Sequence, residues 1–200
     1  MRNVYALSIL TILLAVPASA QDAPKLPAPK AQTPAKPELS HEQKLDELFS
    51  EMKRERNEKA AQRISSRIWQ EWNRSGSSSV DLMMGWAKKA MDDKKYDVAL
   101  DFLDQIVTLD PKYPEGWNRR ATLHFMMQNF SKSMADIEQT LELEPRHFGA
   151  LSGMAQIMAG RERKELALAA YQRVLEIYPM DRNAQNQVSE LSEELAGEAI

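Results

Sequence analysis

The stretch LDPKYPEGWNRRA, Leu109–Ala121, returns 34 residues later as LEPRHFGALSGMA, Leu143–Ala155. A shorter echo, IYPMDRNA, begins at Ile177. One proline marks each copy at a spacing of 34 residues, at Pro111, Pro145 and Pro179. A fixed period of this length indicates stacked supersecondary units, because each unit buries its apolar face only against its neighbours.

Other residue types keep the same period. Small residues occupy two positions of it, Ala87, Ala121 and Ala155, and Ala99, Ser133 and Ala167. Large apolar residues occupy three more: Met83, Trp117 and Leu151; Leu103, Ile137 and Tyr171; Val107, Leu141 and Leu175. Within each period the apolar residues recur every three or four positions, which predicts two helices. Each proline falls where the second helix must end, because proline lacks an amide hydrogen. The small residues would let two antiparallel helices approach closely.

This pattern resembles the tetratricopeptide repeat (TPR) family over residues 80–179. WNRRA at Trp117–Ala121, the small residues at 99, 133 and 167, and the L-x-P endings carry the resemblance. Two departures are Arg120, where the neighbouring units have large apolar residues, and Gly160, which comes early in its turn. The resemblance implies an all-α fold, a right-handed α-solenoid of stacked antiparallel helix pairs.

The segment before the first clear unit is predicted to be a degenerate helical hairpin in the same register. One period back, Phe49 stands in for Met83 and Trp69 for Leu103. Lys53 takes a position where alanine is expected, and a serine-rich stretch replaces the closing proline. Terminal repeats are often atypical because they cap the stack.

The segment after the third unit is predicted to be a capping helix. Its narrow apolar stripe consists of Ala184, Val188, Leu191 and Leu195. A membrane-surface helix is the alternative, but such helices carry basic and aromatic residues that this stretch lacks.

The chain begins with the layout of a cleavable secretory signal. Met1–Asn3 is a short basic end, Val4–Val16 is apolar, and Pro17–Ala20 offers a small-residue cleavage site before Gln21. Thirteen helical residues reach only about 20 Å, too short for a membrane span. Residues 21–38 hold five prolines and no aromatic residue, which predicts an extended linker.

These observations divide the chain into seven predicted segments. They are a signal peptide (1–20), a Pro-rich disordered linker (21–40), the degenerate hairpin (41–79), three TPR units (80–113, 114–147 and 148–180) and the capping helix (181–200).

The sequence offers no material for common catalytic or metal sites. There is no cysteine, and the three histidines, His41, His124 and His147, are too far apart for a zinc motif. No nucleophile motif or phosphate-binding loop is present. Without residues 1–20, 25 basic and 29 acidic residues remain, which gives no footprint for nucleic acid. We therefore expect no enzyme activity, no cofactor and no nucleic-acid partner. The four tryptophans follow apolar helical positions and are expected in the core.

By the resemblance, the first helix of each unit lines an inner, concave face where TPR proteins usually hold a peptide. The candidate partner-binding residues on this face are Met84, Lys88, Met91, Asp92, Asn118, Thr122, Phe125, Met126, Ser152 and Gln156. Among them, two methionines of the first unit and Phe125 and Met126 of the second are large apolar residues expected to meet water. Such a patch usually marks an interaction site.

The sequence therefore predicts a non-catalytic adaptor for a protein or peptide partner. The alternative is a structural, self-associating scaffold whose apolar inner face is covered by a second copy or by the C-terminal helix. The lysines and asparagines that some cytosolic TPR proteins use to clamp a carboxylate are not matched. The runs EGWNRRAT and LELEPRHFGAL also resemble small exported TPR proteins of alphaproteobacteria, which implies a periplasmic location and a role in the cell envelope.

Overall fold

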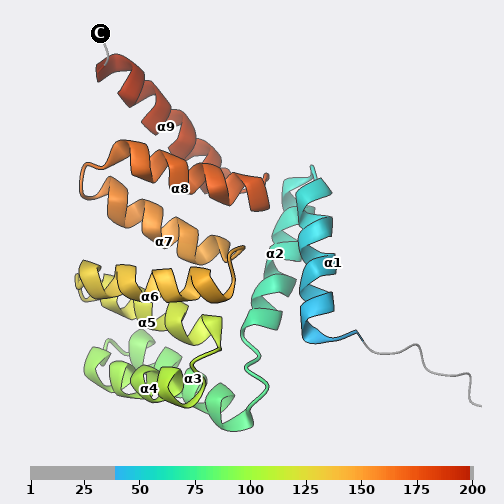
Figure 1. Ribbon diagram of the computed structural model, residues 1–200, viewed down its shortest axis with the longest axis vertical. Coiled ribbons are helices and arrows are strands. Elements are labelled where there is room, and N and C mark those ends of the chain that lie inside the picture. Colours follow the sequence, from blue (N-terminus) through green and yellow to red (C-terminus); the bar gives the residue numbers. More distant parts are fainter. Residues whose placement is uncertain (1–38, 199–200) are drawn as a thin grey trace, which may run out of the picture. The chain divides into compact units, whose positions relative to one another are not determined.

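The computed structural model describes residues 39–198, and their regular structure is entirely α-helical (Figure 1). The helices are α1 (His41–Arg54), α2 (Glu58–Trp72), α3 (Ser78–Asp92), α4 (Tyr96–Leu109), α5 (Pro114–Met126), α6 (Phe130–Leu143), α7 (Phe148–Ala159), α8 (Lys164–Ile177) and α9 (Arg182–Glu198). The predicted signal peptide and nearly all of the predicted linker lie outside the described residues. Between residues 39 and 198, no helix combines the length and apolar character that crossing a membrane requires.

Three antiparallel helix pairs, α3–α4, α5–α6 and α7–α8, form the repeat stack. The small residues at the two periodic positions are all buried where the paired helices cross. In the middle pair, the Ser133 hydroxyl donates a hydrogen bond of 2.8 Å to the carbonyl of Ala121. A larger side chain at either position would separate the helices, because the interior is close-packed. The predicted all-α solenoid is confirmed.

The turn inside each pair repeats at the backbone level as well. Its left-handed residues lie 34 apart and have φ angles of 59°, 61° and 57°, at Lys94, Gln128 and Glu162. The amide after each of them bonds the carbonyl five residues back, at 2.8 Å for Lys95 to Ala90, 2.8 Å for Asn129 to His124 and 2.9 Å for Arg163 to Met158. This arrangement is the Schellman motif, which satisfies the last carbonyls of a helix.

Successive pairs pack closely at one glycine. A Cβ added to Gly116 of α5 would lie 2.9 Å from Ile106 Cγ2 of α4, closer than real Cβ atoms come to a neighbour. One repeat earlier the same position holds Leu82, and one repeat later it holds Ala150. The first pair therefore presents a bulky residue at the position where stacking on a preceding pair requires a small one.

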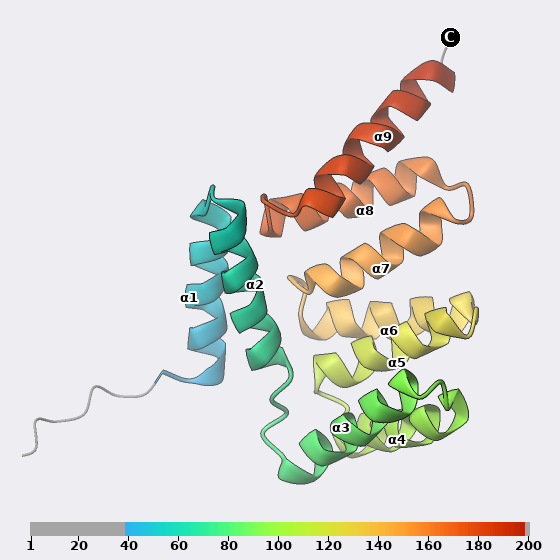
Figure 2. The ribbon, with the colours of Figure 1, turned by 180° about the vertical axis from the view of Figure 1, so that it is seen from behind.

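The α1–α2 hairpin does not continue the stack, and its predicted place ahead of α3 is wrong. Figures 1 and 2 show it beside the stack, next to the ends of α6, α7 and α8. Its buried side chains share one core with Phe148, Leu151, Tyr171 and Tyr178 of the third pair and with Leu191 of α9. The bulk of Leu82 opposes regular stacking on α3, and the aromatic surface of the third pair offers the hairpin another site.

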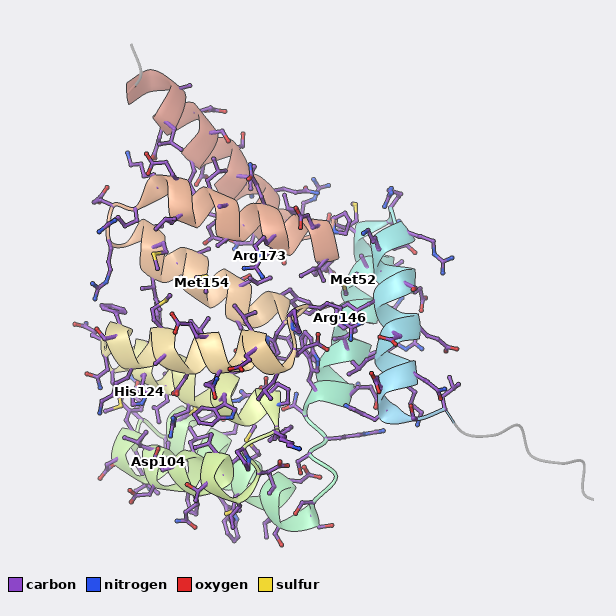
Figure 3. All side chains as sticks on the ribbon, viewed as in Figure 1. Met52, Asp104, His124, Arg146, Met154 and Arg173 are labelled. Atoms are coloured by element: carbon purple, nitrogen blue, oxygen red, sulfur yellow. The ribbon has the colours of Figure 1, made fainter. Side chains whose placement is uncertain are left out.

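Polar contacts fix the hairpin in this place. Arg146, in the turn between α6 and α7, pairs with Asp46 of α1 at 2.7 Å and lies over the Phe49 ring at 4.3 Å. Figure 3 shows Arg146 between the stack and the hairpin. At the other end of the hairpin, Arg182 of α9 pairs with Glu58 of α2 at 3.0 Å.

The displaced hairpin leaves one tryptophan outside the core. Trp72 is buried, and Trp69 and Trp117 are partly buried, but Trp86 on α3 is 48% exposed. The prediction of a core position for Trp86 is therefore wrong. It assumed that a preceding repeat would cover α3.

A glycine in α7 provides a test of the hairpin docking. A Cβ on Gly149 would lie 2.7 Å from Cη2 of Trp69, whereas one on Gly153 would make an ordinary contact of 3.5 Å with Ile137 Cδ1. Alanine gains roughly 0.5–1 kcal/mol in a helix, and overpacking costs about 1–3 kcal/mol. We expect Gly149→Ala to lower the free energy of unfolding measured with urea and to increase proteolysis of residues 41–72. The matched control, Gly153→Ala, should leave stability unchanged or raise it; equal behaviour of the two variants would contradict the docking.

Candidate functional site

The ten predicted partner-binding residues lie on α3, α5 and α7, which form one side of the stack, called here the inner face (Figure 2). Their exposure differs widely. Lys88, Asp92, Thr122, Met126 and Gln156 are exposed, Phe125 and Ser152 are half-buried, and Met84, Met91 and Asn118 are buried. The inner face thus offers fewer apolar side chains to solvent than the sequence predicts.

The two methionines of the first pair are core residues. Met84 is 7% exposed and Met91 is 8% exposed. Both belong to a cluster that joins α3 and α4 to Leu123 of α5. The expectation that they meet water is wrong, because α5 packs closely enough to cover them. Of the four large apolar residues predicted on this face, only Met126 is exposed, at 43%.

The predicted charged residues of the first pair neutralise one another. Lys88 Nζ lies 2.6 Å from Asp92 Oδ2, one helical turn away. Both side chains are well exposed, so the pair contributes only about 0.3–0.5 kcal/mol to stability. The inner face of α3 therefore carries an ion pair rather than a free positive charge.

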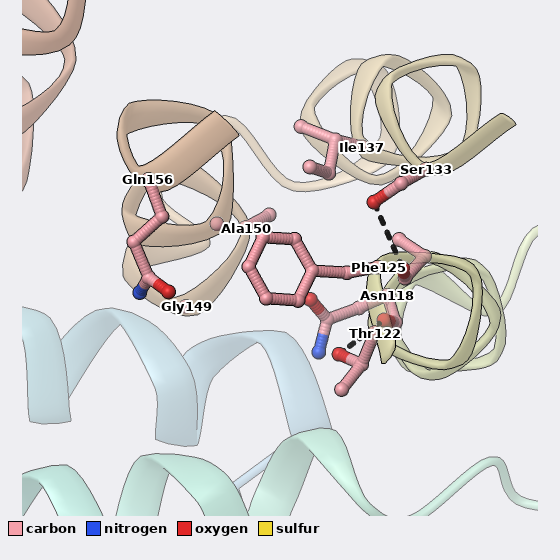
Figure 4. Close-up of a pocket in the computed structure, with 10 residues that line it drawn as sticks. Asn118, Thr122, Phe125, Ser133, Ile137, Gly149, Ala150 and Gln156 are labelled. Carbon is pink, nitrogen blue, oxygen red and sulfur yellow. Dashed lines mark hydrogen bonds between the residues drawn. The ribbon is translucent and has the colours of Figure 1, made fainter. Parts of the chain in front are cut away.

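Four of the predicted residues come together at a cavity between α5 and α7. The cavity has a volume of about 160 Å³ and is lined by Asn118, Ala121, Thr122, Phe125, Ser133, Ile137, Gly149, Ala150, Gly153 and Gln156. Figure 4 shows the Phe125 ring extending between the two helices, with Ile137 of α6 behind it. The space exists because α7 contributes glycine and alanine here, where larger side chains would fill it.

Most hydroxyl groups of this cavity are already hydrogen-bonded within the protein. Besides the Ser133 bond to α5, the Thr122 hydroxyl donates to the carbonyl of Asn118 at 3.0 Å (Figure 4). Asn118 itself donates an amide hydrogen to Glu115 at 2.8 Å. Within the described residues the Gln156 amide makes no such bond, so it is the polar group at this cavity best placed to bind something else.

A buried polar network lies next to the cavity, and sequence reasoning missed it. At its centre is Glu115 of α5, which is fully buried. Its Oε1 accepts from Arg119 at 2.6 Å, and its Oε2 accepts from Asn118 and lies 3.3 Å from His147 Nε2. The sequence places Glu115 in the first turn of a helix, where a carboxylate is ordinarily solvated, and gives no sign of this burial.

His147 connects this network to the hairpin. The sequence places it in a loop, but it caps the N-terminus of α7, where its Nδ1 accepts from the Ala150 amide at 3.1 Å. Because Nδ1 accepts, Nε2 carries the hydrogen and donates to Glu115. The imidazole also stacks on Trp72, with ring centres 4.0 Å apart and planes at 10°. One fully buried side chain thus joins α2, α5 and α7.

The network keeps Glu115 ionised. Burial raises the pKa of Glu115, but the hydrogen bond from His147 and the charge of Arg119 outweigh burial and hold the pKa below its ordinary value. A buried carboxylate that is paired in this way is costly to disturb, because removing one partner leaves the others unsatisfied.

The remaining buried charges lie on the other side of α5 and are structural. Arg120 bonds both oxygens of Asp136 on α6, at 2.7 and 2.9 Å, and Asp104 on α4 at 2.8 Å. His124 lies 3.9 Å from Asp136, and burial lowers the pKa of His124. These contacts tie three helices together and bring no nucleophile to the histidine. In residues 39–198, no three His, Asp or Glu side chains gather closely enough to hold a metal ion.

Comparison with known proteins identifies the repeats. No family model matches the chain. A TPR repeat-containing protein of Rhizobium etli is 54% identical over 158 residues, which is 79% of this chain and 78% of that protein. RNA polymerase II-associated protein 3 of Homo sapiens is 28% identical over 102 residues, 51% of this chain but 15% of that protein.

Solved structures show the same fold. The first TPR of Spaghetti, bound to an HSP90 peptide, superimposes with a TM-score of 0.55 at 26% identity, covering 58% of this chain and 93% of that one. The Sgt2 TPR domain of Aspergillus fumigatus gives a TM-score of 0.55 at 18% identity, over 60% of this chain and 81% of that one. The molecule is thus an all-helical repeat protein. On the strength of the Rhizobium relative, the chain belongs to the tetratricopeptide repeat family.

The ionised network predicts a pH-dependent loss of stability. We expect Glu115→Gln to lower the free energy of unfolding by about 2 kcal/mol at pH 7, the contribution of hydrogen bonds to a charged group. Because the folded-state pKa of Glu115 is depressed, this contribution is present above its unfolded value, about 4.3, and is lost as pH falls through the folded value. Urea unfolding of both proteins from pH 7 to pH 3 measures it. A difference that stays constant down to pH 3 would contradict an ionised Glu115.

Proposed function

We propose that this protein is a non-catalytic adaptor that holds a segment of a partner protein on its inner face. The observation that carries the proposal is the cavity between α5 and α7, which lies among four residues chosen from the sequence alone. A partner segment would run across α5 and α7, and one apolar side chain would enter the cavity.

The cavity suits a small apolar group. Cavities of about 150 Å³ with apolar walls accept a ring the size of benzene. Ala121, Ile137 and Phe125 supply the apolar surface here. The free amide of Gln156 at the same cavity would bond the partner backbone, and the exposed Met126 would add an adaptable contact near the end of α5.

The comparisons support peptide binding without naming the peptide. The first TPR of Spaghetti was solved with an HSP90 peptide of sequence SRMEEVD, an acidic tail. The chain resembles that domain over 58% of its length. On this chain Lys88 is paired with Asp92, so the α3 side offers no free cation to an acidic tail. We therefore propose a partner segment recognised by an apolar side chain rather than by a terminal carboxylate.

Variants that fill the cavity test this proposal. Gly153→Leu should fill the space beside Ile137 and reduce partner capture at least tenfold, while the melting temperature stays within a few degrees. Partner capture is measured by in-cell crosslinking from a photoreactive residue at Thr122, followed by mass spectrometry. Gly197→Leu is the matched control, because a Cβ there meets nothing within 4 Å. Identical crosslinks from Thr122 and from Gln172, an exposed residue of α8, would remove the groove as the binding site.

We also propose that the protein is exported to the periplasm and acts in the cell envelope. The order of residues 1–20 supports export, as does the likeness of its repeats to those of exported alphaproteobacterial TPR proteins. The protein recovered from the periplasmic fraction of cells that express the full chain should begin at Gln21. N-terminal sequencing decides the point, and an uncleaved chain in the cytoplasmic fraction would refute export.

A further inference from the structure

The end of the stack formed by α3 and α4 exposes a group of large apolar side chains. Leu82 is 53% exposed, Trp86 48% and Val98 40%. Phe102 is half-buried and packs against Trp86, with ring centres 5.5 Å apart. These four residues are called here the end face. Figures 1 and 2 place α3 and α4 at one end of the stack, with the hairpin to the side.

Equivalent positions in the other two pairs are covered. Leu82 corresponds to Gly116 and Ala150, both buried, and Phe102 corresponds to Asp136 and Ala170, also buried. At Gly116 the covering residue is Ile106 of the preceding pair. The end face is therefore the surface that repeat packing normally closes, and within the described residues nothing closes it.

A further TPR unit does not fit this surface. The preceding pair reaches Gly116 only because that residue has no side chain, and Leu82 stands at the same position. The hairpin that precedes α3 in sequence is held elsewhere by the fully buried Met52 and Ile68. The occupant must instead offer a surface that accommodates bulky side chains.

Gly85 supplies such a surface on the end face itself. It lies in the middle of α3, three residues after Leu82 and next to Trp86, and a Cβ there would meet nothing within 4 Å. Glycine weakens a helix relative to alanine, and no contact within the described residues requires it here. A glycine in this setting allows another backbone to approach closely. The end face thus presents a projection, Trp86, directly beside a notch, Gly85.

The charges at its margin are also of both signs. Lys89 follows Trp86 by three residues, and Asp101 follows Val98 by three, so each lies on the same side of its helix as the apolar residues. Both are exposed. A face that carries a projection and a notch, and a cation and an anion, can be complementary to its own copy rotated by 180°.

We propose that a second copy of this chain covers the end face. The two α3 helices cross at Gly85 about a two-fold axis, Trp86 of each copy packs over Gly85 of the other, and Lys89 of each meets Asp101 of the other. The inner faces stay open, because Met84 and Met91 lie on the opposite side of α3. The dimer therefore carries two grooves and does not depend on the groove being a binding site.

Sedimentation equilibrium tests the proposal on protein purified after expression of the full chain. We expect a dimer in the micromolar range. Trp86→Glu and Gly85→Gln should each weaken association at least tenfold and leave circular dichroism and melting of the monomer unchanged, because both positions are exposed. Leu166→Glu is the matched control, since Leu166 on α8 is also 53% exposed, and it should stay dimeric.

Crosslinking tests the geometry independently. The chain contains no cysteine, so Gly85→Cys introduces its only thiol and should form a disulfide-linked dimer under mild oxidation. Gln172→Cys, on exposed α8, should remain monomeric. A wild-type protein that is monomeric at 100 µM, or equal crosslinking from the two positions, would overturn the proposal. So would a monomer in which Trp86→Glu abolishes capture of another protein, because the end face would then serve that protein.

Discussion

Each helix pair depends on two small residues that face each other where the helices cross. At these crossings the side chains are alanine or serine and are buried in all three repeats. Close approach at this point places the larger residues of both helices, such as Leu103 and Ile106, in contact with the next pair. Because every pair has the same crossing, the three pairs stack regularly, and α3, α5 and α7 come to lie on one side. The inner face and its cavity are consequences of this spacing.

The stack ends where that spacing changes. Leu82 takes the place of Gly116, and this one enlargement opposes the close contact with which another pair would stack. The α1–α2 hairpin instead buries its aromatic side chains against the third pair, where His147 stacks on Trp72. One substitution in the repeat thus has two effects. It leaves an apolar surface on α3 and α4, and it places a helix of the hairpin next to the residues that line the cavity.

The buried Glu115 makes these two regions of the molecule interdependent. It receives hydrogen bonds from Arg119 and Asn118 on its own helix and from His147 at the start of α7. Asn118 also lines the cavity, and Arg119 reaches Asn73 at the end of α2, 3.4 Å away. The position of α7 relative to α5, and hence the width of the groove, is therefore set by a charged group shared with the hairpin. In a TPR fold, where neighbouring pairs otherwise meet through apolar contacts, this gives the groove a fixed polar wall.

The sequence by itself determined the helices, their pairing and the family, because the 34-residue spacing of small residues and prolines acts locally within each repeat. It also identified the residues of α5 and α7 that surround the cavity, since their positions follow from the same period. Only the tertiary structure decided the burial of Met84 and Met91, the exposure of Trp86 and the place of the hairpin. These depend on contacts between residues far apart in the chain, such as Trp69 with Gly149 and Trp72 with His147. Periodicity describes what each residue shares with its counterpart 34 positions away, whereas packing at the ends of a stack depends on residues that have no such counterpart.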